Sequence, residues 1–518
     1  MIIKKRGDYM EKRASGILMH ISSLPGKFGI GTFGQEAYDF VDFLKKTGQT
    51  YWQLLPLTTT SYGDSPYQSF SAVAGNVNFI DFKKLQEAGL LDEDDYNSVS
   101  FGEDEEIVDY ALLFKVRRPI LEKAVINFLA DKTNLKKLAL FEEKNETWLD
   151  DYAEFMAIKE HFGNKSLQEW GDKKAIRRDE ERLVRYRHLL ADEISYHKVT
   201  QYFFFEQWLA LKAYANKNKI KIIGDMPIYV AKDSVEVWTM PELFKMDDDL
   251  QPLSVAGCPP DEFSDEGQLW GNPIYDWKKH RETGFAWWIY RIQESFKIYD
   301  ILRIDHFKGF SDYWEIKGNS KTAKNGSWHP GPGIALFRAV QNVLGDMPII
   351  AEDLGYVDDR ARQLLKETGF PGMKILEFGF YDLSGRSVDI PHHYVQNSVA
   401  YIGTHDNDVV NGWYDRLTVE QEEFVDAYTN RKPIEPVNQA MLRLLFSTVS
   451  NTAILTMQDL LNKPASSRMN TPSTIGGNWQ WRMRAKDLTQ DKIDFLSKLT
   501  KLYQRGNEEN DTKNKTIQ

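Results

Sequence analysis

Cysteine is almost absent from this sequence, since Cys258 is the single one among 518 residues. A chain with one thiol forms no intrachain disulfide and fits a reducing compartment. Long apolar runs are missing too: no segment reaches transmembrane length without charged residues, and residues 1–16 lack the apolar core of a signal peptide. We therefore expect a cytoplasmic protein with no membrane partner.

Positive charge is in deficit, with 65 Lys and Arg against 76 Asp and Glu and a net charge of −11. Because phosphate backbones bind basic surfaces, this balance argues against a nucleic-acid partner. Metal-site spacings such as His-x-x-x-His or a Cys pair are lacking, and so is a Gly-rich phosphate loop. We expect no metal and no cofactor, and nothing in the sequence implies an obligate protein partner.

Eight short apolar runs alternate with helical patterns along the chain. Runs of Ile, Leu and Val that alternate with helices are typical of parallel strands covered on both faces, and eight of them predict a closed (β/α)8 barrel. Between the first two runs, Ala37, Phe40, Val41 and Leu44 follow the spacing of an amphipathic helix. The predicted strands are 16–21, 51–57, 220–230, 300–307, 347–355, 372–378, 399–406 and 452–460.

A barrel of this kind needs about 250 residues, so the rest of the chain must form insertions. We assign the barrel to residues 14–83 and 200–503. Residues 84–199, rich in Asp, Glu, Lys and Leu, predict a helical insertion, and residues 231–299, rich in Pro, Gly, Asp and Trp, predict loops over the barrel mouth. The ends, 1–13 and 504–518, are predicted to be flexible.

Ionisable residues gather where four predicted strands end, which is where barrel enzymes place their chemistry. One such Asp could simply cap a helix, but four strand ends with carboxylates are hard to explain by capping. Several carboxylates around one cavity fit glycoside chemistry, which needs one ionised and one protonated group. The residues are Asp225, then Arg303 and Asp305, then Glu352 and Asp353, then His405 and Asp406.

Arg303 and Asp305 are two residues apart and share a strand face, so we expect the cation to lower the pKa of Asp305 and keep it ionised. Glu352 is expected to hold the proton, with its pKa raised by a desolvated, anionic pocket. Aromatic residues beside polar ones in "SYGDSPYQSF" and "GQLWGNPIYDW" would suit the faces and hydroxyl rims of sugar rings.

Six motifs in a fixed order carry a family resemblance that extends from about Ser15 to Trp481. They are "SPYQSFSAVAGN", "GDMPIYVA", "CPPDEFSDEGQLWGNPIY", "RIDHFKGF", "AEDLG" and "GTHDND". Together they resemble the 4-α-glucanotransferases, the amylomaltase or disproportionating-enzyme family, which is related to the α-amylases. The resemblance implies a (β/α)8 barrel without a separate C-terminal β-domain. It also implies retaining transfer of an α-1,4-glucan segment from a malto-oligosaccharide to the 4-hydroxyl of an acceptor glucan or glucose.

The resemblance also implies roles for individual residues. Asp305 would be the nucleophile, Glu352 the general acid/base and Asp406 the third carboxylate. Glu262 stands where several relatives carry an aromatic residue, so acceptor contacts would rely on Phe263 or Trp270. The substrate-binding residues would be Ser65, Tyr67, Asp225, Phe263, Trp270, Asn272, Arg303, His405 and Asn470.

Two other functions use the same barrel: an α-1,4-glucan hydrolase, and an inactive glucan-binding protein. An inactive protein would be expected to lose a carboxylate, but Asp305, Glu352 and Asp406 are all present. A hydrolase differs only in that water attacks the covalent intermediate, so transfer requires a well-placed acceptor and exclusion of water. The aromatic loops 57–76 and 250–275 are the candidates for that exclusion.

Overall fold

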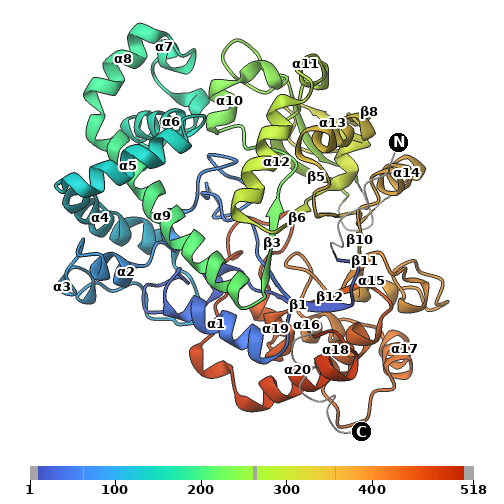
Figure 1. Ribbon diagram of the computed structural model, residues 1–518. Helices are drawn as coiled ribbons and strands as arrows, with labels where there is room; N and C mark the ends of the chain where they lie inside the picture. Colours follow the sequence, from blue (N-terminus) through green and yellow to red (C-terminus); the bar gives the residue numbers. More distant parts are fainter. Residues whose placement is uncertain (1–9, 62, 261–264, 356–357, 507–518) are drawn as a thin grey trace.

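Eight parallel strands close into a barrel (Figure 1) in the computed structural model, which describes residues 10–61, 63–260, 265–355 and 358–506. The order around the barrel is β1-β12-β11-β10-β9-β6-β3-β2, with parallel pairing throughout. The predicted (β/α)8 fold is confirmed. The strands are β1 (Ala14–Leu18), β2 (Tyr51–Gln53), β3 (Lys221–Met226), β6 (Ile301–Ile304), β9 (Ile349–Ala351), β10 (Gly372–Ile375), β11 (Ser398–Tyr401) and β12 (Thr452–Thr456).

The strands are shorter than the apolar runs that predicted them. Strand β2 ends at Gln53, yet Leu54, Leu55 and Leu57 beyond it are still buried. An apolar run predicts that its residues are buried, not that they all pair with a neighbouring strand. After Gln53 the strand pairing ends, although the side chains that follow remain buried.

Helices cover the outside of the barrel and fill most of the connections between strands. On α1 the buried face holds Ala37, Phe40, Val41 and Leu44, as predicted. The helices that follow barrel strands are α1 (Gln35–Lys46), α9 (Ala191–Lys217), α12 (Ala286–Ile298), α13 (Ile334–Leu344), α14 (Asp359–Thr368), α15 (Leu376–Gly379), α16 (Val410–Tyr414), α17 (Val419–Thr429), α18 (Val437–Ser447), α19 (Met457–Leu460) and α20 (Gln490–Leu502).

A helical layer lies beside the barrel between β2 and β3, and α9 runs from it back to the barrel (Figure 1). Helix α9 packs on α6 of this layer and also on α1 and β3 of the barrel. The predicted boundary between residues 199 and 200 therefore falls inside one continuous helix. The other helices of the layer are α2 (Phe82–Glu87), α3 (Asp94–Asn97), α4 (Tyr110–Leu129), α5 (Lys132–Lys144), α6 (Leu149–His161), α7 (Lys173–Ile176) and α8 (Glu180–Leu189).

A second, antiparallel sheet of order β5-β4-β7-β8 is built partly from residues 231–299. That segment was expected to be loop-rich, but it also holds two short helices and the barrel helix α12. Its strands were hard to predict because they are short, contain Gly257, Gly271 and Pro273, and pair irregularly near Val255. The elements are α10 (Val235–Thr239), β4 (Ser254–Cys258), β5 (Gln268–Pro273), α11 (Trp277–Glu282), β7 (Asp312–Lys317) and β8 (Gly326–Pro330).

Two residues of the ends predicted to be flexible are fixed in place. Arg13 donates hydrogen bonds to the carbonyls of Tyr503, Thr448 and Phe446. Arg505 is fully buried. In the part of the chain that the structure describes, no helix is both long and apolar enough to span a membrane.

Candidate active site

A buried arginine at the end of β6 contacts three carboxylates. Arg303 Nη1 lies 2.7 and 2.6 Å from the two oxygens of Asp225 and 3.2 Å from Oδ1 of Asp305. Its Nη2 lies 3.2 Å from Oε2 of Glu352. Asp225 is fully buried, whereas the side chains of Asp305 and Glu352 keep exposed fractions of 24% and 18%. The two accessible carboxyls are therefore the ones a ligand in the barrel mouth can reach.

Strand register explains why these residues meet. Asp225 on β3 is the direct register partner of Arg303 on β6, and Ile304 pairs with Ala351 on β9. Glu352 comes immediately after Ala351, and its main-chain N–H donates to the carbonyl of Ile304 at 3.1 Å. Parallel pairing thus brings residues from three separate sequence motifs to one edge of the barrel.

The carboxyl groups of Asp305 and Glu352 form a hydrogen bond, so the two groups titrate together. Burial, and then the charge of Glu352, raises the pKa of Asp305 well above its usual range. Burial also acts to raise the pKa of Glu352, but Arg303 and the main-chain N–H of His306 outweigh it and lower that pKa.

These two directions are opposite to those expected from the sequence, since the pKa of Asp305 is raised and that of Glu352 is lowered. The physical reason is geometric. Arg303 gives its two shortest contacts to Asp225, and Glu352 receives a further hydrogen bond of 2.6 Å from the N–H of His306.

A second group of predicted residues faces the first. Asp406 lies after β11, and its Oδ1 accepts a 2.6 Å hydrogen bond from the amide of Asn470. Its Oδ2 lies 3.3 Å from Nε2 of His405. The Tyr67 ring stacks on His405, with centroids 5.2 Å apart, and its hydroxyl donates to Asp225 at 2.8 Å. Tyr67 therefore links the Asp406 group to the Arg303 group.

The remaining predicted residues lie around this centre. Ser65 Oγ accepts from the main-chain N–H of Tyr67 at 3.2 Å, so it shapes the turn that presents the ring. The buried Asn272 bonds the side chain of Gln68 at 3.0 Å and the carbonyl of Val230 at 2.8 Å. Trp270 of β5 packs on His306. Phe263 and Glu262 lie outside the described residues.

Two residues at the site were not assigned a role from the sequence. Arg468 donates to the carbonyls of Asp406 and Asn470 at 2.5 and 2.7 Å, and so ties the two loops together. His306 contacts both Glu352 and Trp270. No sequence spacing could reveal the Arg468 contacts, because they join main-chain atoms of loops that meet only in the fold. His306 directly follows Asp305 in the motif "RIDHFKGF", so its place beside that carboxylate is visible in the sequence.

The family model described as 4-alpha-glucanotransferase matches residues 19–489. This chain belongs to that family. It is 56% identical to the 4-alpha-glucanotransferase of Streptococcus pneumoniae over 500 residues, which cover 96% of this chain and 99% of the relative. It is 49% identical to that of Clostridium butyricum, over 94% of this chain and all of the relative.

Solved structures agree with the assignment. The amylomaltase from Streptococcus agalactiae in complex with acarbose superposes with a TM-score of 0.95 and 64% identity, covering 96% of this chain and all of that one. The amylomaltase from Corynebacterium glutamicum, with a TM-score of 0.74 and 17% identity over 96% of this chain and 76% of its own, supports the fold alone. The predicted family and class of enzyme are confirmed, and the hydrolase and inactive-protein alternatives are not favoured.

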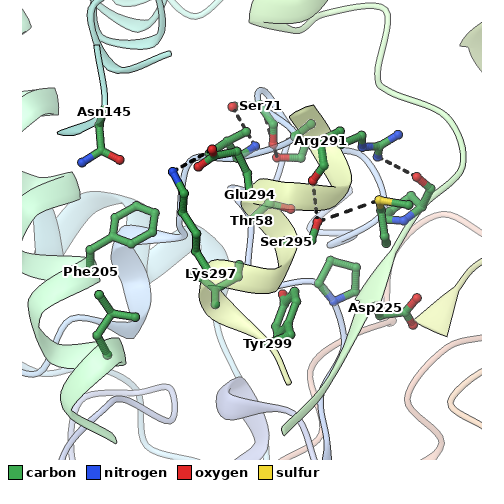
Figure 2. Close-up of a pocket in the computed structure, with 18 of the residues that line it drawn as sticks. Thr58, Ser71, Asn145, Phe205, Asp225, Arg291, Glu294, Ser295, Lys297 and Tyr299 are labelled. Atoms are coloured by element: carbon green, nitrogen blue, oxygen red, sulfur yellow. Dashed lines mark hydrogen bonds and ion pairs between the residues drawn. The ribbon is translucent and has the colours of Figure 1, made fainter. Parts of the chain in front are cut away.

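A cavity of about 550 Å³ backs onto the site between the barrel and the helical layer. Figure 2 shows Asn145 and Phe205 on one side of it and Asp225 on the other. Asp225 and Tyr67 line this cavity and also belong to the Arg303 group, so the cavity and the candidate active site have these two residues in common. Among the described residues, no group of three or more His, Cys, Asp or Glu side chains could hold a metal ion.

Proposed function

We propose that this chain is a retaining 4-α-glucanotransferase that moves α-1,4-glucan segments between malto-oligosaccharides in the cytoplasm. The observation that carries the proposal is the pair of linked carboxyls, Asp305 and Glu352, which share one buried arginine and open to the barrel mouth. Retaining glycoside chemistry uses two such groups, one ionised and one protonated.

In the first step Asp305 attacks the anomeric carbon while Glu352 protonates the departing glycosidic oxygen. This step requires the proton of the pair to be on Glu352 and the carboxylate of Asp305 to be ionised. The ionised Asp305 keeps its contact with Arg303. The products of the step are a shortened glucan with a free 4-hydroxyl and a β-linked glucosyl-enzyme.

In the second step Glu352, now ionised, removes the proton from the 4-hydroxyl of an acceptor. That oxygen attacks the anomeric carbon, the bond to Asp305 breaks, and a new α-1,4 bond forms. Arg303 and the N–H of His306 both stabilise the ionised form of Glu352 that this step requires.

The second group of residues would bind the sugar being transferred. Asp406, oriented by Asn470, would hydrogen-bond its hydroxyls together with His405, and the Tyr67 ring would stack on its apolar face. Trp270 and Asn272 lie on the second sheet, on the side we assign to the acceptor.

The test is incubation with maltotriose, following free glucose, total reducing ends and product lengths together. A transferase releases glucose and makes longer glucans while the number of reducing ends stays constant. A rise in reducing ends without longer products would mean that water attacks the intermediate, and would overturn the proposal in favour of a hydrolase.

The proton transfer has its own test. Glu352→Gln should stall on maltotriose, because a glycosidic oxygen needs a proton to leave, yet still react with α-glucosyl fluoride, whose fluoride leaves unprotonated. Loss of both activities to the same degree would count against the acid/base role of Glu352.

A further inference from the structure

His306 has a backbone conformation that is unusual for a residue with a side chain. Its φ and ψ are 48° and 51°, in the left-handed region that favours glycine. The turn that this conformation makes directs two successive N–H groups at Glu352. The N–H of His306 donates to Oε2 at 2.6 Å, and the N–H of Phe307 donates to the carbonyl at 3.0 Å.

The imidazole of the same residue makes a different contact. It lies edge-to-face with Trp270, with ring centroids 4.8 Å apart and planes at 84°. Trp270 is held from the other side by Gln268, which accepts from the indole N–H at 3.1 Å. Burial lowers the pKa of His306 to about 4, so the ring is neutral near pH 7 and the contact is between two aromatic groups rather than a cation and a ring.

We propose that His306 is a positioning residue that couples the acid/base Glu352 to the acceptor side of the cleft. Its left-handed backbone fixes the carboxyl of Glu352, and its imidazole fixes Trp270. The residue thereby aligns the base with the acceptor hydroxyl that the base must deprotonate. This inference rests on the proposed transferase function, because it concerns the step in which an acceptor replaces water.

Two substitutions at the same position separate the two contacts. His306→Gly removes the ring but keeps the left-handed backbone free of strain, whereas His306→Ala removes the ring and adds a Cβ that disfavours that backbone. The three measurements are α-glucosyl fluoride cleavage without acceptor, glucose release from maltotriose, and the ratio of transfer to hydrolysis at fixed acceptor concentration.

For His306→Gly we expect the transfer-to-hydrolysis ratio to fall about fivefold and fluoride cleavage to fall clearly less, because the contact on the acceptor side is lost while the backbone contact with Glu352 is kept. For His306→Ala we expect, in addition, a further fall of about threefold in glucose release from maltotriose, which needs the proton of Glu352, with less change for the fluoride. Trp270→Ala should lower the ratio as His306→Gly does, and the double variant should lose little more.

A matched control is Gln504→Gly, an exposed left-handed position with φ 53° at the end of α20, which should leave all three measurements unchanged. The inference is overturned if His306→Gly lowers fluoride cleavage and transfer equally, or if its effect adds fully to that of Trp270→Ala. Failure of the transferase function itself would be visible separately, as a wild-type enzyme that makes no longer glucans from maltotriose.

Discussion

Two buried arginines at opposite ends of the barrel have opposite surroundings. Arg303 at the mouth contacts three carboxylates. Arg505 at the other end donates to five main-chain carbonyls, those of Ala14, Phe446, Thr448, Ser450 and Asn451, where β1 and β12 begin. Neither side chain is accessible, yet Arg303 contacts ionisable groups, whereas Arg505 contacts main-chain carbonyls and the uncharged hydroxyl of Thr448.

The pKa values of the two residues follow these surroundings. Burial acts to lower the pKa of both, but at Arg303 the charges of Asp225, Glu352 and Asp305 outweigh burial and raise it. At Arg505 burial prevails, and the pKa is lowered. A buried arginine therefore indicates a candidate active site when its partners are ionisable and some of them are partly exposed. A buried arginine that binds main-chain carbonyls instead stabilises the fold.

The largest effect is expected when a carboxylate of the Arg303 group at the barrel mouth is removed. Asp305→Asn should lower glucose release from maltotriose by about 10⁴-fold or more, because the proposed nucleophile is lost. Folding should not suffer, since burial and the neighbouring carboxylates already disfavour the charge of Asp305. Kinetics and thermal unfolding of the same preparation check both points, and residual activity within tenfold of wild type would contradict the assignment.

The next largest effect is expected from Arg303→Lys. An ammonium keeps the charge but cannot contact Asp225, Asp305 and Glu352 together as the planar guanidinium does. We expect kcat to fall by roughly 10²- to 10³-fold with the fold retained. An activity close to wild type would mean that charge alone suffices at this position.

The matched change at the other end, Arg505→Lys, should act on stability instead. Several buried carbonyls would lose their donor, which we expect to lower the free energy of unfolding by about 3 kcal/mol. Denaturant unfolding measures this loss, and kcat for maltotriose should stay within about twofold, because the site lies at the opposite end of the barrel. A fall in kcat as large as that of Arg303→Lys would contradict the distinction between an arginine that acts in the active site and one that acts only on stability.

The smallest expected effect is a change in the pH dependence of the enzyme's activity. Activity requires one proton on the Asp305–Glu352 pair, so it should fall at low pH, when both are protonated, and at high pH, when neither is. The charge of Asp225 raises the pKa of Asp305. Asp225→Asn removes that charge, so the alkaline limb of the kcat/KM profile should move to lower pH, whatever the change in rate. An alkaline limb that does not move, or that moves to higher pH, would contradict the effect of the Asp225 charge on the pKa of Asp305.

The barrel and the family could be predicted from the amino-acid sequence, and so could the grouping of most residues of the candidate site. Apolar runs alternating with helical patterns predict strands that are buried on both faces, and this hydrophobic pattern can be read from the local sequence. The residues at the strand ends followed, because parallel strands bring their carboxyl ends to one edge, so Asp225, Arg303, Asp305 and Glu352 could be grouped before any coordinates were known.

The contacts through which these charged groups interact could not be predicted from the sequence. The short contact of Arg303 with Asp225, its longer contact with Asp305, and the hydrogen bond from the N–H of His306 to Glu352 depend on distances of a few tenths of an ångström. Those distances are set by register and by one left-handed turn. The contacts of Arg468 and the closure of the barrel by Arg505 are equally invisible in the sequence, because they bind main-chain carbonyls, and every residue has one.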